Sequence, residues 1–338
     1  MITRISMPQM ESQSLLPCDG PAGKKPGAQY PKDMLNYYRL VFITNRRTDK
    51  GYISQGRIVR DGIYHKIVIK TDSFRREFRG GSLIALPGRI EASKRNEYGE
   101  YLIEGLVILP EPDPRVNLFR TVPKNWVEDR SMLNDAAKLF DAMPPPYRQL
   151  YNAIFWEEKR FRTYCETPSS IKNHHAFATG NLAHSLEVAR LMLLSGLLDN
   201  PGFSIILALL HDCAKASEYT RNRHGNLEMS DQGRLLGHRI MLVQWITEAI
   251  TRHKIPDLPD PHIWAIIHCL TASPNIQYLG IRAPSMPEAV VLSGMDRISG
   301  QVNMLLQNQK TEGWGRYVES LKASPFKIPA LAQVSTRE

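Results

Sequence analysis

The spacing of apolar residues changes once along this chain of 338 residues, and that change limits the folds available to it. Between residues 37 and 110 the apolar residues form short runs separated by glycines, and residues 63–69 alternate in the way that β-strands do. After residue 130 the apolar residues recur at helical spacing, and no strand pattern of comparable strength is found. We therefore predict a multidomain protein with a small all-β part followed by an all-α part.

Changes in composition divide the chain into five segments. Residues 1–34 are rich in Pro, Gly, Ser and Gln and lack an apolar period, which predicts a flexible N-terminal tail. Residues 35–112 hold five strand-like runs, which is typical of a small closed barrel; the OB-fold is the commonest five-stranded example, and an SH3-like barrel stays open as an alternative. Residues 113–130 form a linker that contains prolines. Helical periodicity fills residues 131–312, and the prolines of residues 313–338 favour a non-helical C-terminal tail.

Positive charge is concentrated in the β part. The whole chain has a formal net charge of +9, and residues 35–112 hold fourteen Lys or Arg against nine Asp or Glu. Cations and aromatic residues are interleaved there, as a single-stranded nucleic acid requires for stacking its bases and neutralising its phosphates. The residues that we predict to bind a strand are Arg46, Arg47, Lys50, Tyr52, Arg57, Tyr64, Arg75 and Arg76. The same pattern also suits a barrel core with a solvated arginine surface, so both interpretations stay open.

The helical part contains a group of residues suited to binding a metal ion. His211 and Asp212 are adjacent at the end of an apolar helix, where burying them is costly unless they are paired or bound to a metal. Imidazole and carboxylate are good ligands for divalent Mn, Mg, Fe or Ni, and the further ligands must come from other helices. His184 and Asp296 are the candidates, since each is a single polar residue within an apolar helical face. Lys215 lies four residues after His211 on the same face, where it is placed to contact a phosphoryl oxygen.

The order His184, His211-Asp212, Asp296 resembles the H…HD…D signature of the HD-domain metal-dependent phosphohydrolases. The likeness is closest to the YhaM-type 3′-5′ exoribonucleases. LLHDCAKASEY resembles their Leu-His-Asp-x-x-Lys-x-x-Glu, NHHAFATGNLAHSLEVARL resembles the segment that leads into their first ligand, and APSMPEAVVLSGMDRISGQV resembles their closing helix. The similarity covers roughly residues 36–305.

This resemblance implies an OB-like barrel followed by an HD-domain helical bundle. It implies that His184, His211, Asp212 and Asp296 ligate a divalent metal ion and that Lys215 contacts phosphate. QGRLLGHRI resembles the segment that supplies a second-site ligand, here His238, which would otherwise serve as a general base. The implied activity is a metal-dependent phosphodiesterase, a 3′-5′ exonuclease that hydrolyses single-stranded nucleic acid, with RNA favoured over DNA.

The chain departs from the family at one point. Two-metal HD enzymes usually carry a His-His pair in the helix before the closing segment, and this chain has Leu270 and Thr271 there. His268 lies one helical turn before Thr271 and is a candidate replacement. The pair His174 and His175 is a further candidate for a second metal or for substrate phosphate. The four ligands of one metal are therefore expected, and a second metal stays open.

Three other functions stay open at this point. HSLEVA around His184 is also similar to HD-domain relaxase-like proteins of mobile elements, which process DNA. A nucleotide phosphohydrolase would use the same metal ligands. A catalytically silent nucleic-acid-binding protein would keep the HD helices as a scaffold only.

Cysteine usage and hydropathy bear on the location of the protein. The four cysteines form no C-x-x-C pair, which favours a reducing, cytoplasmic setting. The sequence contains no run of about 18 apolar residues, the length that a membrane-spanning helix needs. The first residues also lack the apolar core of a secretory signal. We expect no membrane association, and the sequence leaves the oligomeric state open.

Overall fold

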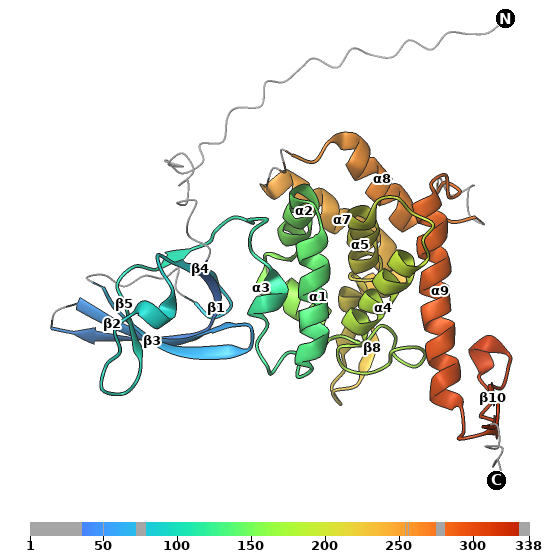
Figure 1. Ribbon diagram of the computed structural model, residues 1–338, viewed down its shortest axis with the longest axis horizontal. Coiled ribbons are helices and arrows are strands. Elements are labelled where there is room, and N and C mark those ends of the chain that lie inside the picture. The colour runs from blue at the N-terminus through green and yellow to red at the C-terminus, as the bar shows by residue number, and fades with distance from the viewer. Residues whose placement is uncertain are drawn as a thin grey trace, which may run out of the picture.

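The computed structural model describes residues 36–49, 51–71, 79–253, 255, 257–274 and 281–330. It shows a curled β-sheet followed by a mostly helical region (Figure 1). The predicted tail over residues 1–34 and the predicted strand-binding residues Lys50, Arg75 and Arg76 lie outside the described residues.

The N-terminal sheet has the strand order β5-β3-β2-β1-β4-β6. Its strands are β1 (Asn36–Thr48), β2 (Gly51–Arg60), β3 (Ile63–Thr71), β4 (Leu83–Leu86), β5 (Tyr101–Ile103) and β6 (Val107–Ile108). β3 and β5 are parallel, and the other pairs are antiparallel. The alternation of apolar residues directs Leu40, Ile58 and Ile67 into a core of their own, on one face of the sheet.

In the described residues the sheet is curled but not closed, so it is compatible with the predicted OB-like layout while the closure itself is not found. β5 and β6 stand at opposite ends of the strand order, so the sheet is open. The chain between residues 100 and 110 forms these two short strands at opposite edges. Neither of them is long enough to close the sheet on itself.

The helical region follows the predicted helices closely. Its helices are α1 (Arg130–Ala142), α2 (Pro145–Phe155), α3 (Glu158–Glu166), α4 (Gly180–Leu194), α5 (Pro201–Leu210), α6 (Lys215–Glu218), α7 (Asp231–His253), α8 (Asp260–Thr271) and α9 (Pro287–Asn308). Proline in the first turn begins several of them, and Asp129 and Asn200 cap α1 and α5 by accepting backbone N–H groups. α5 is buried along nearly its whole length and packs against α4, α8 and α9. None of the helices in the described part of the chain combines the length and apolarity that crossing a membrane requires.

The expectation of an all-α second part is wrong in detail. β7 (Tyr219–Arg221) and β8 (Leu227–Met229) form a hairpin directly after α6. β9 (Gly313–Trp314) and β10 (Phe326–Lys327) form a second small ribbon inside the predicted C-terminal tail. Strands of two or three residues are too short to produce a detectable alternation in the sequence.

The segment over residues 113–130 is a packed joint between the two parts. Its 3-10 helix η2 (Leu118–Thr121) places Leu118 and Phe119 in the core of the helical region, which also includes Tyr37 and Leu83 of the sheet. Arg39 of β1 is almost completely buried at this joint. Its guanidinium donates to Thr121 Oγ1 at 3.0 Å and lies 5.1 Å from the ring centre of Trp126. Burial lowers the pKa of Arg39 to about 10, so the side chain stays charged at neutral pH.

Candidate metal centre

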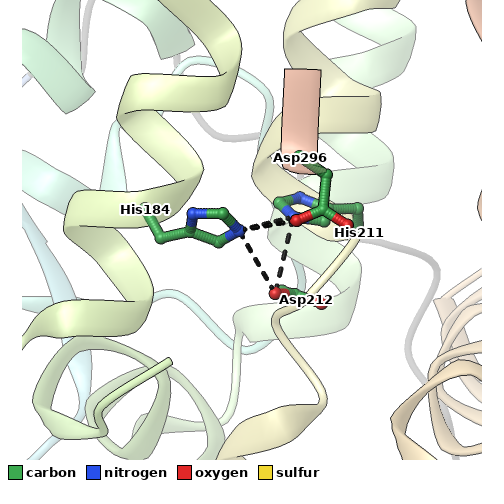
Figure 2. A group of neighbouring side chains, drawn as sticks. All are labelled: His184, His211, Asp212 and Asp296. Atoms are coloured by element: carbon green, nitrogen blue, oxygen red, sulfur yellow. Dashed lines mark hydrogen bonds and ion pairs between the residues drawn. The ribbon is translucent and has the colours of Figure 1, made fainter. Parts of the chain in front are cut away.

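Four side chains from separate parts of the helical region converge on one point (Figure 2). His184 comes from α4 and Asp296 from α9, while His211 and Asp212 belong to the turn that follows α5. His184, His211 and Asp212 are buried, whereas the side chain of Asp296 is 34% exposed. The cluster is therefore held in the core but reachable from the side on which α9 lies.

The distances within the cluster suit a single metal ion. His184 Nε2 lies 3.0 Å from Asp296 Oδ1 and 3.4 Å from Asp212 Oδ2. His211 Nε2 lies 3.2 Å from His184 Nε2, and one ligand atom from each residue falls within 4.8 Å of all the others. Ligands that surround an ion at about 2.1 Å are separated from one another by about 3 to 4 Å. The four residues match that spacing.

Hydrogen bonds on the far side of each imidazole fix its tautomer. His211 Nδ1 lies 2.8 Å from the carbonyl oxygen of Ala208, which can only accept, so Nδ1 carries the proton. Ser299 donates to Glu187 Oε2, and its oxygen therefore accepts from His184 Nδ1 at 2.9 Å. When both imidazoles are neutral, the two Nε2 atoms therefore turn lone pairs toward each other at 3.2 Å. This arrangement is favourable only with a cation between them, and buried partners of this kind commonly orient metal-bound histidines.

The carboxylates in the cluster also favour a cation. Burial alone would raise the pKa of Asp296, but its hydrogen bonds with His184 and His211 hold that pKa below its usual range. Burial likewise opposes ionisation of Asp212, but Lys215, His211 and His184 together outweigh it, so the pKa of Asp212 lies well below its usual value. Without a metal ion, the hydrogen bonds of His184 with both carboxylates exceed the effect of burial and raise its pKa to about 9, so a proton on Nε2 takes the place of the cation. These donor types accept several divalent ions and select none of them.

Lys215, expected to contact phosphate, and His238, expected to be a second-site ligand or a general base, both lie beside Asp212. Lys215 Nζ lies 2.6 Å from Asp212 Oδ2, and His238 Nε2 lies 3.4 Å from Asp212 Oδ1. α7 changes direction at Gly237, where φ is 71°, a conformation that favours glycine. This kink frees the backbone N–H of His238 from the helix, and Glu218 accepts it. Glu218 therefore belongs to the site. In the sequence, only its position as the glutamate of LLHDCAKASEY pointed to it.

His175 is buried behind the cluster. Its Nε2 lies 3.0 Å from Glu187 Oε2, and its backbone N–H donates to Asn303 on α9. A Cβ at Gly180 would lie 2.0 Å from the carbonyl oxygen of His175, so the close turn before α4 requires glycine. His175 thus supports the Glu187–Ser299–His184 chain of contacts rather than offering a free imidazole to a phosphate.

His174 also lies beside His184. Its ring centre is 5.1 Å from that of His184, as is the ring centre of His175, and its Nε2 is 3.2 Å from Ser169 Oγ. Burial and the neighbouring His184 lower the pKa of His174 to about 4, so its imidazole is neutral at physiological pH. A neutral imidazole at this position is available as a ligand or as a hydrogen-bond partner for substrate.

His268 has a different environment. It lies on α8, where its Nε2 accepts the backbone N–H of Ser285 at 3.0 Å. In the described part of the chain, the group of potential ligands consists of His184, His211, Asp212 and Asp296. The structure does not bring His268 together with them.

The predicted strand-binding residues of the sheet divide between its two faces. Arg46, Arg57 and Tyr64 share one face, whereas Arg47 and Tyr52 are paired across β1 and β2 on the other. The first face also carries Phe42, which the sequence analysis missed. Arg57 Cζ lies 5.5 Å from the ring centre of Phe42 and 6.0 Å from that of Tyr64. Phe42 stands four residues before Arg46, and alternation along the strand could have revealed it.

Comparison with known proteins returned no family model, characterised protein or solved structure that matches this chain. The geometry of the site and the sequence motifs are therefore the features that bear on its function.

Proposed function

We propose that this chain is a metal-dependent phosphodiesterase that hydrolyses single-stranded nucleic acid, with RNA as the expected substrate and the 3′ end as the expected point of attack. The observation that carries the proposal is the convergence of His184, His211, Asp212 and Asp296 beside the ammonium group of Lys215. A buried ligand set next to a fixed cation suits a phosphoryl group that develops negative charge. A resemblance to HD-domain phosphohydrolases implies the same chemistry.

The four ligands would hold one divalent ion, which would polarise a phosphoryl oxygen and make a water molecule easier to deprotonate. Lys215 is placed to neutralise a second phosphoryl oxygen. Burial opposes its charge, but Asp212 raises its pKa above the usual value, so the ammonium form is retained. His238 donates from Nδ1 to Glu218, which leaves Nε2, 3.4 Å from Asp212 Oδ1, as the ring nitrogen that faces the metal centre. His238 is therefore the candidate to accept the proton of the attacking water.

The β-sheet supplies a candidate surface for the strand. The rings of Phe42 and Tyr64 are exposed and lie on either side of the half-buried Arg57 guanidinium. Lys66 on β3 is paired with Arg57 on β2. Rings that stack on bases and cations that neutralise phosphates are the features by which OB-folds hold single strands. The curled, open sheet is compatible with such a fold.

Hydrolysis of end-labelled strands tests this function. Single-stranded RNA and DNA of one sequence, labelled at either end, are incubated with the full chain and Mn²⁺. We expect stepwise shortening from the 3′ end of RNA. His211→Ala and Asp212→Ala should abolish it, and His224→Ala, an exposed histidine on the β7–β8 loop, should not.

Each other outcome would contradict the proposal in a recognisable way. Internal nicking of DNA would favour a relaxase-like protein. Hydrolysis of nucleotides alone would favour a nucleotide phosphohydrolase. Strand binding without any hydrolysis would favour a catalytically silent binding protein.

A further inference from the structure

A pocket of about 570 Å³ lies between α8 and the segment that leads into α9. Trp264, Ala265 and His268 line it from α8, and Arg282 and Met286 line it from the other side. Its volume falls within the range of small-molecule sites. None of the functions considered above uses it.

The pocket is separate from the metal centre. Met286, which lines it, precedes Asp296 on α9 by ten residues. At 1.5 Å per residue these two positions are about 15 Å apart along the helix axis. A small ligand in the pocket would therefore not touch the reacting atoms.

Trp264 offers a flat aromatic surface in this pocket. Its side chain is 65% exposed, which is unusual for so large an apolar group. It lies one helical turn before His268, so both side chains project from the same side of α8. An exposed indole at the wall of a pocket suits stacking against another planar ring.

Two further side chains that line the pocket, His268 and Arg282, carry hydrogen-bond donors. His268 Nε2 accepts the backbone N–H of Ser285, so Nδ1 carries the ring proton of the neutral imidazole. Arg282 adds a guanidinium, whose planar fork fits phosphate oxygens. The described residues that line the pocket include no carboxylate. The lining therefore favours an anion.

We propose that this pocket binds a nucleoside monophosphate, with the base stacked on Trp264 and the phosphate held by Arg282 and His268. One pocket thus offers a planar surface beside phosphate-binding donors, the two features that a nucleotide needs. The nucleotide is either free or a unit of a bound strand. This inference goes beyond the proposed function, because binding here requires neither the metal nor hydrolysis.

Titration of the full chain with AMP in the presence of EDTA, followed by tryptophan fluorescence and calorimetry, tests the proposal. Trp264→Ala should weaken AMP binding by about 5- to 150-fold, the range that base stacking gives, and Trp264→Phe should retain most of the affinity. The matched control is Trp314→Ala, since Trp314 is 66% exposed on β9 and lies outside the pocket. Arg282→Ala should weaken AMP binding and leave adenosine binding unchanged.

Two further comparisons separate this site from the metal centre and identify the source of the nucleotide. His211→Ala should leave AMP binding intact. If Trp264→Ala also weakens the binding of a single-stranded oligoadenylate, the pocket holds a unit of a strand; if it weakens AMP binding alone, the ligand is a free nucleotide. Undetectable AMP binding, or an affinity that Trp264→Ala leaves unchanged, would overturn the proposal.

Discussion

Glu218 accepts two hydrogen bonds from His238, one from its backbone N–H at 2.5 Å and one from its Nδ1 at 3.0 Å. Because a carboxylate only accepts, the imidazole carries a proton on Nδ1, and its Nε2 faces Asp212. The contact with His238 lowers the pKa of Glu218 although burial opposes this, so the carboxylate stays charged. In the proposed mechanism, Glu218 therefore positions His238 to accept a proton at the metal centre.

Glu218→Gln should therefore lower kcat while the protein stays folded. The amide keeps the size of the side chain but cannot stabilise a protonated imidazole, and we expect a loss of about 10- to 100-fold. Steady-state hydrolysis of a labelled strand as a function of pH measures it. The control is Glu228→Gln, which changes an exposed glutamate on β8 and should leave the rate unchanged. Equal rates and pH profiles for the two variants would show that Glu218 does not position the base.

Ser299→Ala should weaken metal binding without removing a ligand. Ser299 links His184 to Glu187, and without it the buried His184 Nδ1 loses its acceptor. Loss of such a supporting hydrogen bond typically lowers metal affinity by about 10- to 100-fold. Calorimetric titration with Mn²⁺ measures the change. Ser293→Ala alters an exposed serine of the same helix and should have no effect; similar affinities for both variants would contradict the assigned role.

Phe42→Ala should weaken the binding of single-stranded RNA. The ring lies against Arg57 on the exposed face of the sheet, and stacking of one base on an aromatic ring contributes about 1 to 3 kcal/mol. Fluorescence anisotropy with a labelled strand gives the affinity. Tyr98→Ala removes another exposed ring, 75% accessible in a loop away from this cluster, and should bind as the unaltered chain does. If the two variants bind equally well, the strand lies elsewhere.

Arg39→Ala should reduce the free energy of unfolding by about 2 to 4 kcal/mol, because it leaves a cavity and removes the hydrogen bond to Thr121 at the joint between sheet and helices. Arg39→Met keeps most of the volume and should cost less. Urea unfolding measures both variants. The exposed Arg89, changed to Ala, should shift stability by less than about 0.5 kcal/mol. A comparably small effect of Arg39→Ala would mean that the buried guanidinium does not stabilise the joint.

Much of the fold could be predicted because local patterns determine it. Alternation places β1, β2 and β3, and helical spacing with proline at the first turns places α2, α8 and α9. Helical periodicity runs without interruption through residues 203–216, but the chain divides there into α5 and α6 at the turn that holds His211 and Asp212. Because the backbone of His211 stays in the right-handed helical region, the spacing of apolar residues continues across the turn, and the end of α5 cannot be detected from it.

The four residues of the candidate metal centre could be found in the sequence, because His184 and Asp296 are single polar residues in apolar helical faces and His211-Asp212 ends an apolar helix. Their supporting partners could not. Ser299 lies 115 residues from His184, and Glu218 lies 20 residues from His238 across the β7–β8 hairpin. Contacts of this kind depend on how helices pack and on the kink at Gly237, and sequence spacing does not encode either.

Addition of metal to the apoprotein should raise its thermal stability, because an ion that binds only the folded chain shifts the equilibrium toward it. At one hundred times the dissociation constant the gain is about 2.7 kcal/mol. A melting curve with and without Mn²⁺ measures it. His211→Ala should remove the shift, and His268→Ala should keep it because His268 lies outside the ligand group. Loss of the shift in both variants would place a ligand on α8.

The most direct test of the account is the stoichiometry of Mn²⁺ binding, measured by calorimetry on the metal-free chain. We predict one ion per chain. Asp296→Asn should reduce the affinity at least 100-fold, whereas Asp199→Asn, an exposed aspartate that follows α4, should leave it unchanged. Failure of the unaltered chain to bind Mn²⁺, or undiminished binding after Asp296→Asn, would contradict the assignment of a metal centre to His184, His211, Asp212 and Asp296.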